Sequence, residues 1–112
     1  MGESGAKAGK DAAETCERTV QDLTPLGDVS SRKMFGGYGI FESGAMFALV
    51  NSQGDLFLKA DDSNRSRFDD AGSKQHGKMP YFLVPPEILS DSDALREWAG
   101  VSLVIAHAAK KK

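Results

Sequence analysis

The residues that could do chemistry are few and lie far apart in the chain. Cys16 is the one cysteine, and the two histidines, His76 and His107, stand 31 residues apart. A zinc site or an activated nucleophile needs such groups at short spacing or beside a base. The sequence has neither arrangement. We therefore expect Cys16 to pack in the core, and we expect no metal site, no cofactor and no enzymatic activity.

Two acidic pairs, Asp61-Asp62 and Asp69-Asp70, flank a short stretch with helical character. Because the members of each pair are sequence neighbours, their carboxylates do not face each other as a catalytic pair would. Helix capping and surface solvation account for them.

A glycine-rich segment, residues 35–41, reads Phe-Gly-Gly-Tyr-Gly-Ile-Phe. It lacks the glycine spacing and the following helix of a phosphate-binding loop. It joins two predicted strands, whereas the GxxG loop of a KH domain joins helices. An RNP1 strand would carry a basic residue where Gly36 stands. The segment therefore predicts a tight hairpin in which Phe35, Tyr38 and Phe41 pack.

Charge is distributed unevenly. The chain has 112 residues and a formal net charge of −2, but residues 11–109 contain 9 basic and 15 acidic residues, a net charge of −6. Non-specific nucleic-acid binding rests on a basic surface, so this acidic core disfavours it. Arg32 and Lys33 form the one adjacent basic pair inside the core, where they could contact a protein or a phosphate backbone.

The length is that of one domain, and no apolar run reaches the roughly 18 residues of a membrane span. No secretory signal is recognisable at the N terminus. We expect a cytoplasmic protein with a flexible tail over residues 1–10, one domain over 11–109 and a basic tip over 110–112.

The pattern along the chain predicts an α+β fold with two layers, in which helices pack on an antiparallel sheet of about five strands. The expected order is α-β-β-β-β-α-β-α. The predicted ranges are helix 11–23, strands 31–35, 38–41, 45–51 and 55–59, helix 62–71, strand 79–84 and helix 90–109. Asp11 and Ser90 are the expected caps of the first and last helix.

Residues 45–50, Ala-Met-Phe-Ala-Leu-Val, are apolar at both odd and even positions, which is typical of a central strand covered on two sides. Helices would cover one side. We expect Phe47 and Phe57 on the other, packed against a protein partner or a second copy of the chain, so a homodimer is predicted.

The segment Arg-Lys-Met-Phe-Gly-Gly-Tyr-Gly-Ile-Phe at residues 32–41 resembles the N-terminal domain of TfoX/Sxy-type competence regulators. The similarity continues through residues 44–50, 56–61, 68–72, 81–87 and 95–99. It implies an antiparallel sheet with packed helices, an architecture similar to that of type III secretion chaperones. It also implies a role in regulating natural competence genes, together with the cyclic-AMP receptor protein. Such regulators carry a second, helical domain, and we expect this chain to be a stand-alone N-terminal domain.

The favoured hypothesis is a non-enzymatic regulatory or adaptor domain that binds a protein, for example in a transcription complex. Its candidate contact residues are Arg32, Lys33, Met34, Phe35, Gly36, Gly37, Tyr38, Phe47 and Phe57. One alternative is weak direct DNA binding through Arg32, Lys33 and the lysines of the two tails. A small enzyme is the least favoured alternative, because no nucleophile–base pair is visible.

Overall fold

The computed structural model describes residues 4–34 and 37–110, with side chains described from residue 12 onward. Its elements, in chain order, are helix α1 (Ser4–Leu23), the 3-10 turn η1 (Thr24–Leu26), strands β1 (Val29–Met34), β2 (Gly37–Glu42), β3 (Ala45–Val50) and β4 (Leu56–Lys59), helix α2 (Arg65–Asp70), strand β5 (Tyr81–Leu83), and helices α3 (Pro86–Leu89) and α4 (Ser92–Lys110).

The five strands form one sheet in which spatial order follows chain order and every neighbouring pair is antiparallel. Glycines with positive φ, Gly44 (87°) and Gly54 (86°), make the turns after β2 and β3. Such turns favour glycine because it adopts positive φ without steric cost, and they let successive strands fold back as hairpins.

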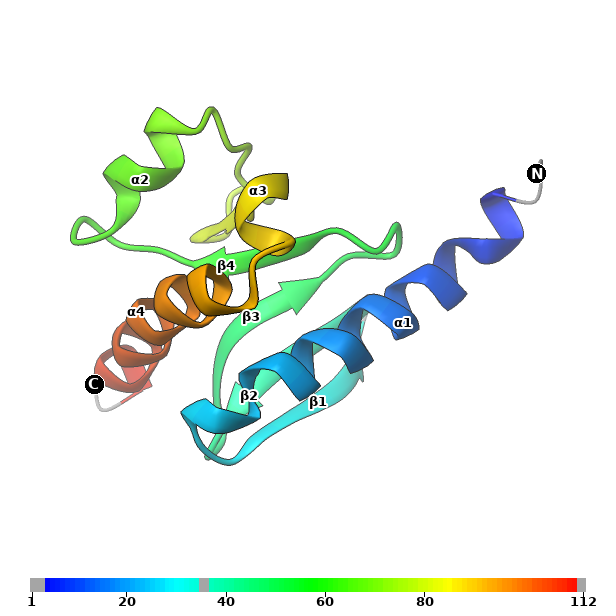
Figure 1. Ribbon diagram of the computed structural model, residues 1–112, viewed down its shortest axis with the longest axis horizontal. Coiled ribbons are helices and arrows are strands. Elements are labelled where there is room, and N and C mark those ends of the chain that lie inside the picture. Colours follow the sequence, from blue (N-terminus) through cyan, green and yellow to red (C-terminus); the bar gives the residue numbers. More distant parts are fainter. Residues whose placement is uncertain (1–3, 35–36, 111–112) are drawn as a thin grey trace.

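Both long helices lie on the same face of the sheet, α1 against β1 and β2 and α4 against β3 and β4 (Figure 1). The main core fills the space between these two layers, and its largest fully buried side chains include Leu23, Ile40, Phe47, Leu58, Phe68 and Leu95. The predicted two-layer α+β fold is confirmed.

Helix α1 is longer than the sequence pattern predicts. It begins at Ser4, whereas we expected residues 1–10 to form a tail and Asp11 to cap the helix. Alanine and lysine, which are strong helix formers, recur in the added turns, and extending an existing helix costs little. The predicted apolar stripe is present, since Ala12, Cys16 and Leu23 are all buried.

The C-terminal helical region is divided in two. Pro86 starts the short helix α3, in keeping with the preference of proline for the first helical turn. The next helix, α4, is capped by Asp91, whose carboxylate accepts hydrogen bonds from the N–H groups of Asp93 (3.1 Å) and Ala94 (3.2 Å). The expected cap, Ser90, instead donates to the carbonyl of Glu87.

A bulge in β3 changes which residues face the helices. Ile40 pairs with Ala48 and Phe41 pairs with Met46, so Phe47 is an extra residue between the two pairs. A bulge of this kind interrupts the alternation of side chains along a strand. Phe47 therefore joins the main core under the helices with an exposed fraction of 0%. The expectation that it lies on the uncovered face is wrong.

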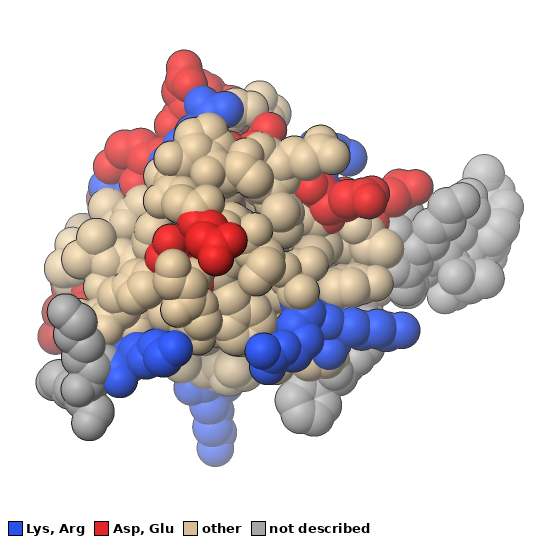
Figure 2. Space-filling model, turned by 90° about the horizontal axis from the view of Figure 1, so that it is seen from below, with Lys and Arg blue, Asp and Glu red and all other residues tan. Residues whose placement is uncertain are grey.

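Charged side chains are segregated over the surface seen in Figure 2. Lys and Arg line mainly the lower part of that view, whereas most Asp and Glu lie in its upper half or near its centre. In the part of the chain that the structure describes, no helix has the length and apolar character needed to cross a membrane.

Candidate functional site

The sheet face opposite α1 and α4 carries a second apolar cluster. Leu49, Phe57 and Tyr81 form its buried centre, and Met46 and Leu83 pack beside them. These residues come from β3, β4 and β5, and the strand register places them side by side, since Phe57 pairs with both Leu49 and Leu83. We call this side of the sheet the open face, because both long helices lie on the other side.

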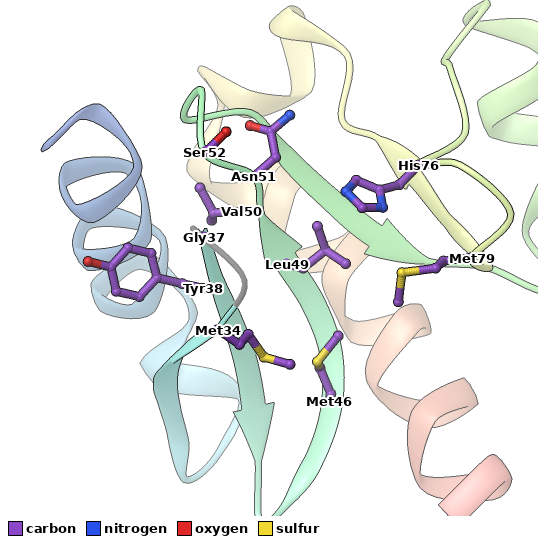
Figure 3. Close-up of a pocket in the computed structure, with 10 residues that line it drawn as sticks. All are labelled: Met34, Gly37, Tyr38, Met46, Leu49, Val50, Asn51, Ser52, His76 and Met79. Atoms are coloured by element: carbon purple, nitrogen blue, oxygen red, sulfur yellow. The ribbon is translucent and has the colours of Figure 1, made fainter. Parts of the chain in front are cut away.

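A groove of about 280 Å³ lies in the open face. We call it the methionine groove and define it by Met34, Gly37, Met46, Leu49, His76 and Met79. Figure 3 shows the three methionine side chains around one hollow, supplied by β1, β3 and the loop before β5. Three of the four methionines of the chain therefore line it.

Two of the methionines lie over a glycine of β2. A Cβ atom added to Gly39 would lie 2.7 Å from Sδ of Met34 and 2.9 Å from Sδ of Met46. The two thioethers thus converge over a glycine, and they fill space that any other residue at position 39 would occupy. Unbranched, polarisable methionine side chains in such a place can rearrange around different apolar groups.

The loop after α2 forms one wall of the groove, and backbone hydrogen bonds hold this loop in place. The N–H of His76 donates to the carbonyl of Tyr81 (2.8 Å), and the N–H of Met79 donates to the carbonyl of His76 (3.0 Å). The His76 ring lies edge-on to Phe57, with centroids 4.9 Å apart, and its buried Nδ1 has no hydrogen-bond partner in the described chain. Met79, by contrast, is 41% exposed. The wall is therefore ordered but presents an accessible thioether.

Tyr81 ties the fifth strand to the third across the open face. Its hydroxyl donates a hydrogen bond to the carbonyl of Met46 at 3.2 Å, although 35 residues separate the two. Burial raises the pKa of Tyr81 to about 12, because the ionised phenolate would lose its hydration. Tyr81 is thus a neutral structural group at physiological pH.

Cations stack on aromatic rings of the open face. The Arg32 guanidinium lies 4.9 Å from the centroid of Phe41, and Nζ of Lys59 lies 5.2 Å from that of Tyr81. Phe41, Lys59 and Tyr81 line a second, shallower hollow that also contains Met46, Met79 and Lys110. Because Met46 and Met79 line both hollows, the methionine groove continues into a region edged by positive charge.

The candidate contact residues predicted from the sequence lie on both faces of the sheet. Arg32 and Met34 lie on the open face, Gly37 lines the groove, and Phe57 lies beneath His76 with an exposed fraction of 3%. Phe35 and Gly36 fall outside the described residues.

The other nominated residues lie on the helix side of the sheet. Lys33 pairs with Tyr38 and so shares its face, and Tyr38 packs against the main core, although it also lines one end of the groove (Figure 3). Phe47 is in that core. Since neighbouring residues of a strand point to opposite faces, Arg32 and Lys33 do not form one basic patch.

Sequence reasoning missed the greater part of the groove. Met46 and Leu49 lie in the apolar strand whose two-sided character was recognised, but the bulge at Phe47 moves Met46 to the open face, where simple alternation would not place it. His76 and Met79 come from a loop that offered no periodicity. The signal available in the sequence was the presence of Met34, Met46 and Met79. The strand hairpins and the loop before β5 bring these three methionines together.

The thiol and the titratable groups offer little chemistry. Cys16 is 2% exposed, as expected, and burial raises the pKa of its thiol, which disfavours the nucleophilic thiolate. His107 Nε2 lies 2.6 Å from Oε1 of Glu42, far along the chain from Cys16. Among the described side chains of residues 12–34 and 37–110, no three of His, Cys, Asp or Glu gather as metal ligands.

Comparison with known proteins agrees with the family resemblance of the sequence. The family model described as the TfoX N-terminal domain matches residues 21–106. The chain belongs to the TfoX N-terminal domain family. It is also 36% identical over 59 residues to the DNA transformation protein TfoX1 of Aliivibrio fischeri; the match covers 53% of this chain and 28% of that protein.

Every residue of the methionine groove lies inside the part of the chain that matches the TfoX N-terminal domain, whereas Lys110 lies beyond it. The match covers less than a third of the length of the Aliivibrio fischeri protein. The groove is therefore a feature of the domain itself.

Proposed function

We propose that this TfoX N-terminal domain is a non-enzymatic regulatory module that acts in the control of DNA transformation by binding another protein through its open face. Family membership and the name of the Aliivibrio fischeri relative support the regulatory part. A cytoplasmic location and association with transcription proteins belong to the same proposal.

The observation that carries the proposal is the accessible apolar groove on the side of the sheet opposite the helices. A sheet buries its apolar faces by packing, and a recess lined by partly exposed methionines is typical of a binding surface. Met34, Met46 and Met79 are each at least partly exposed around this groove. A protein partner would complete the burial that α1 and α4 provide on the opposite face.

Two observations favour a protein partner over DNA. The basic pair of β1 divides between the two faces, with Arg32 over Phe41 and Lys33 beside Tyr38. The groove itself is lined largely by thioethers and aliphatic groups, and its polar members, such as Asn51, Ser52 and His76, include no Lys or Arg to pair with phosphate. The buried Cys16 likewise gives no support to an enzyme.

Site-specific photo-crosslinking tests the proposal. A photoreactive benzoylphenylalanine replaces Met79, which is 41% exposed at the groove, or Val104, which is 69% exposed on α4 as a matched control. Both variants are irradiated in a lysate of the native host, with and without nuclease. We expect discrete crosslinks to protein at position 79 that survive nuclease and are absent at position 104. Crosslinks at 104 alone, or loss of the crosslinks at 79 after nuclease treatment, would contradict the proposal.

A further inference from the structure

The open face differs in charge from the rest of the domain. None of the residues that line the methionine groove or the shallower hollow beside it is acidic, whereas Lys59 and Lys110 line the latter. Arg32 adds a third positive charge above Phe41. The two hollows have no acidic lining residue, although residues 11–109 contain 15 acidic residues against 9 basic ones. In the view of Figure 2, Lys and Arg gather mainly in the lower part of the molecule, apart from most Asp and Glu.

The three cations are positioned by uncharged groups. Arg32 and Lys59 stack on aromatic rings, and Nζ of Lys110 donates to the carbonyl of Gly44 at 3.2 Å. The salt bridges found between described residues involve other side chains. Cations held in this way keep their capacity to pair with carboxylates of a partner, and their geometry is already set.

We propose that the open face binds an acidic amphipathic segment of a partner protein. Apolar side chains of the segment lie in the methionine groove, and its carboxylates pair with Arg32, Lys59 and Lys110. This inference rests on the proposed function and adds the chemistry of the partner. It follows from charge complementarity, because a basic edge around an apolar recess selects a ligand with the reverse pattern.

A second copy of the chain fits the open face less well. Two open faces in a symmetric dimer would bring Arg32, Lys59 and Lys110 of each copy together, which is unfavourable for like charges. A nucleic acid would satisfy the three cations but would leave the apolar groove without a partner. An acidic amphipathic segment satisfies both parts of the surface.

Matched peptides test the inference. Three fluorescein-labelled peptides of equal length are used: one with leucine anchors and intervening glutamates, one with lysine for every glutamate, and one with serine for every leucine. A single-stranded oligonucleotide is the fourth probe. By fluorescence anisotropy, we expect the first peptide to bind at least about tenfold more tightly than any other probe.

Binding is located by NMR of the chain labelled at its methionine methyl carbons, with signals assigned through Met34→Leu, Met46→Leu and Met79→Leu. We expect the acidic peptide to shift all three signals. Lys110→Glu, at the exposed C-terminal end of α4, should weaken binding of the acidic peptide by about tenfold. Arg18→Glu changes the net charge equally on exposed α1 and should leave the affinity within about twofold.

Several results would overturn the inference: equal or tighter binding of the basic peptide or the oligonucleotide, unshifted signals of Met34 and Met46, or an equal effect of Arg18→Glu and Lys110→Glu. Any of these, combined with nuclease-resistant protein crosslinks at position 79, would leave the proposed function standing and reject the acidic partner. Absence of protein crosslinks at position 79 would reject the proposed function itself.

Discussion

Two glycines of β2, two residues apart, meet different obstacles. A Cβ atom on Gly37 would lie 2.1 Å from the carbonyl oxygen of Val50, which is fixed backbone, whereas one on Gly39 would meet only side chains, the flexible ends of Met34 and Met46 and, at 3.0 Å, a ring carbon of Phe41. Gly37 is therefore required for close strand approach. We expect Gly37→Ala to lower the free energy of unfolding by about 3 kcal/mol and Gly39→Ala by about 1 kcal/mol or less. Urea denaturation measures both, and equal losses would contradict this account.

Glu42 joins three segments through one carboxylate, which accepts hydrogen bonds from the N–H of Asp28 and the hydroxyl of Ser43 and contacts His107. The bond to His107 and then the bond to the Asp28 N–H lower the pKa of Glu42. A carboxyl whose pKa is lowered by folding stabilises the fold above its unfolded pKa, and this stabilisation is lost as pH falls through the folded value.

Replacing Glu42 with glutamine should therefore destabilise the domain at about pH 7, and the difference from the parent chain should shrink as the pH falls below about 4. Urea unfolding at a series of pH values measures the difference. Glu14→Gln, at an exposed position of α1, is the matched control. A Glu42→Gln difference that is constant with pH would rule out the contribution of the ionised carboxylate.

At the scale of elements, the order of helices and strands was predictable because glycine-bearing turns separate short apolar stretches. The assignment of faces was not. Alternation counted from Leu49 places Phe47 on the open face, and a single bulge beside Ile40 reverses that outcome. The loop that carries His76 and Met79 has no sequence period; backbone hydrogen bonds to β5 and the packing of the His76 ring on Phe57 hold it at the groove. The candidate site was therefore less predictable than the fold.

The packing of α4 against α2 gives a further prediction. Trp98 is partly buried, lies edge-on to Phe68 with centroids 5.1 Å apart, and is covered by the Arg67 guanidinium at 4.8 Å. We expect Trp98→Ala to reduce the free energy of unfolding by about 3 kcal/mol, the lower end for a buried aromatic residue. Val104→Ala, at a position that is 69% exposed on the same helix, should cost less than about 0.5 kcal/mol. A Trp98→Ala loss below about 1 kcal/mol would show that the two helices do not depend on this contact.

At the scale of the whole molecule, the helices and the charges divide the domain into two sides. The long helices bury one sheet face, and exposed acidic residues such as Asp93 and Glu97 lie on the helix side. The opposite face combines an apolar groove with cations. A partner and a second copy of the chain would therefore compete for the open face. Salt would affect them differently, because it screens both the attraction of an acidic partner and the repulsion between two basic faces.

This division predicts opposite salt dependences. Binding of the acidic peptide should weaken several-fold when salt rises from about 50 to about 500 mM, because screening removes attraction to Arg32, Lys59 and Lys110. The homodimer proposed from the sequence, if it forms through two open faces, should strengthen over the same range, because screening removes repulsion between the two basic edges. Sedimentation equilibrium measures the association. A dimer that dissociates as salt rises would instead join the basic open face of one copy to the acidic helix side of another, and such a head-to-tail contact would leave one groove free for a partner.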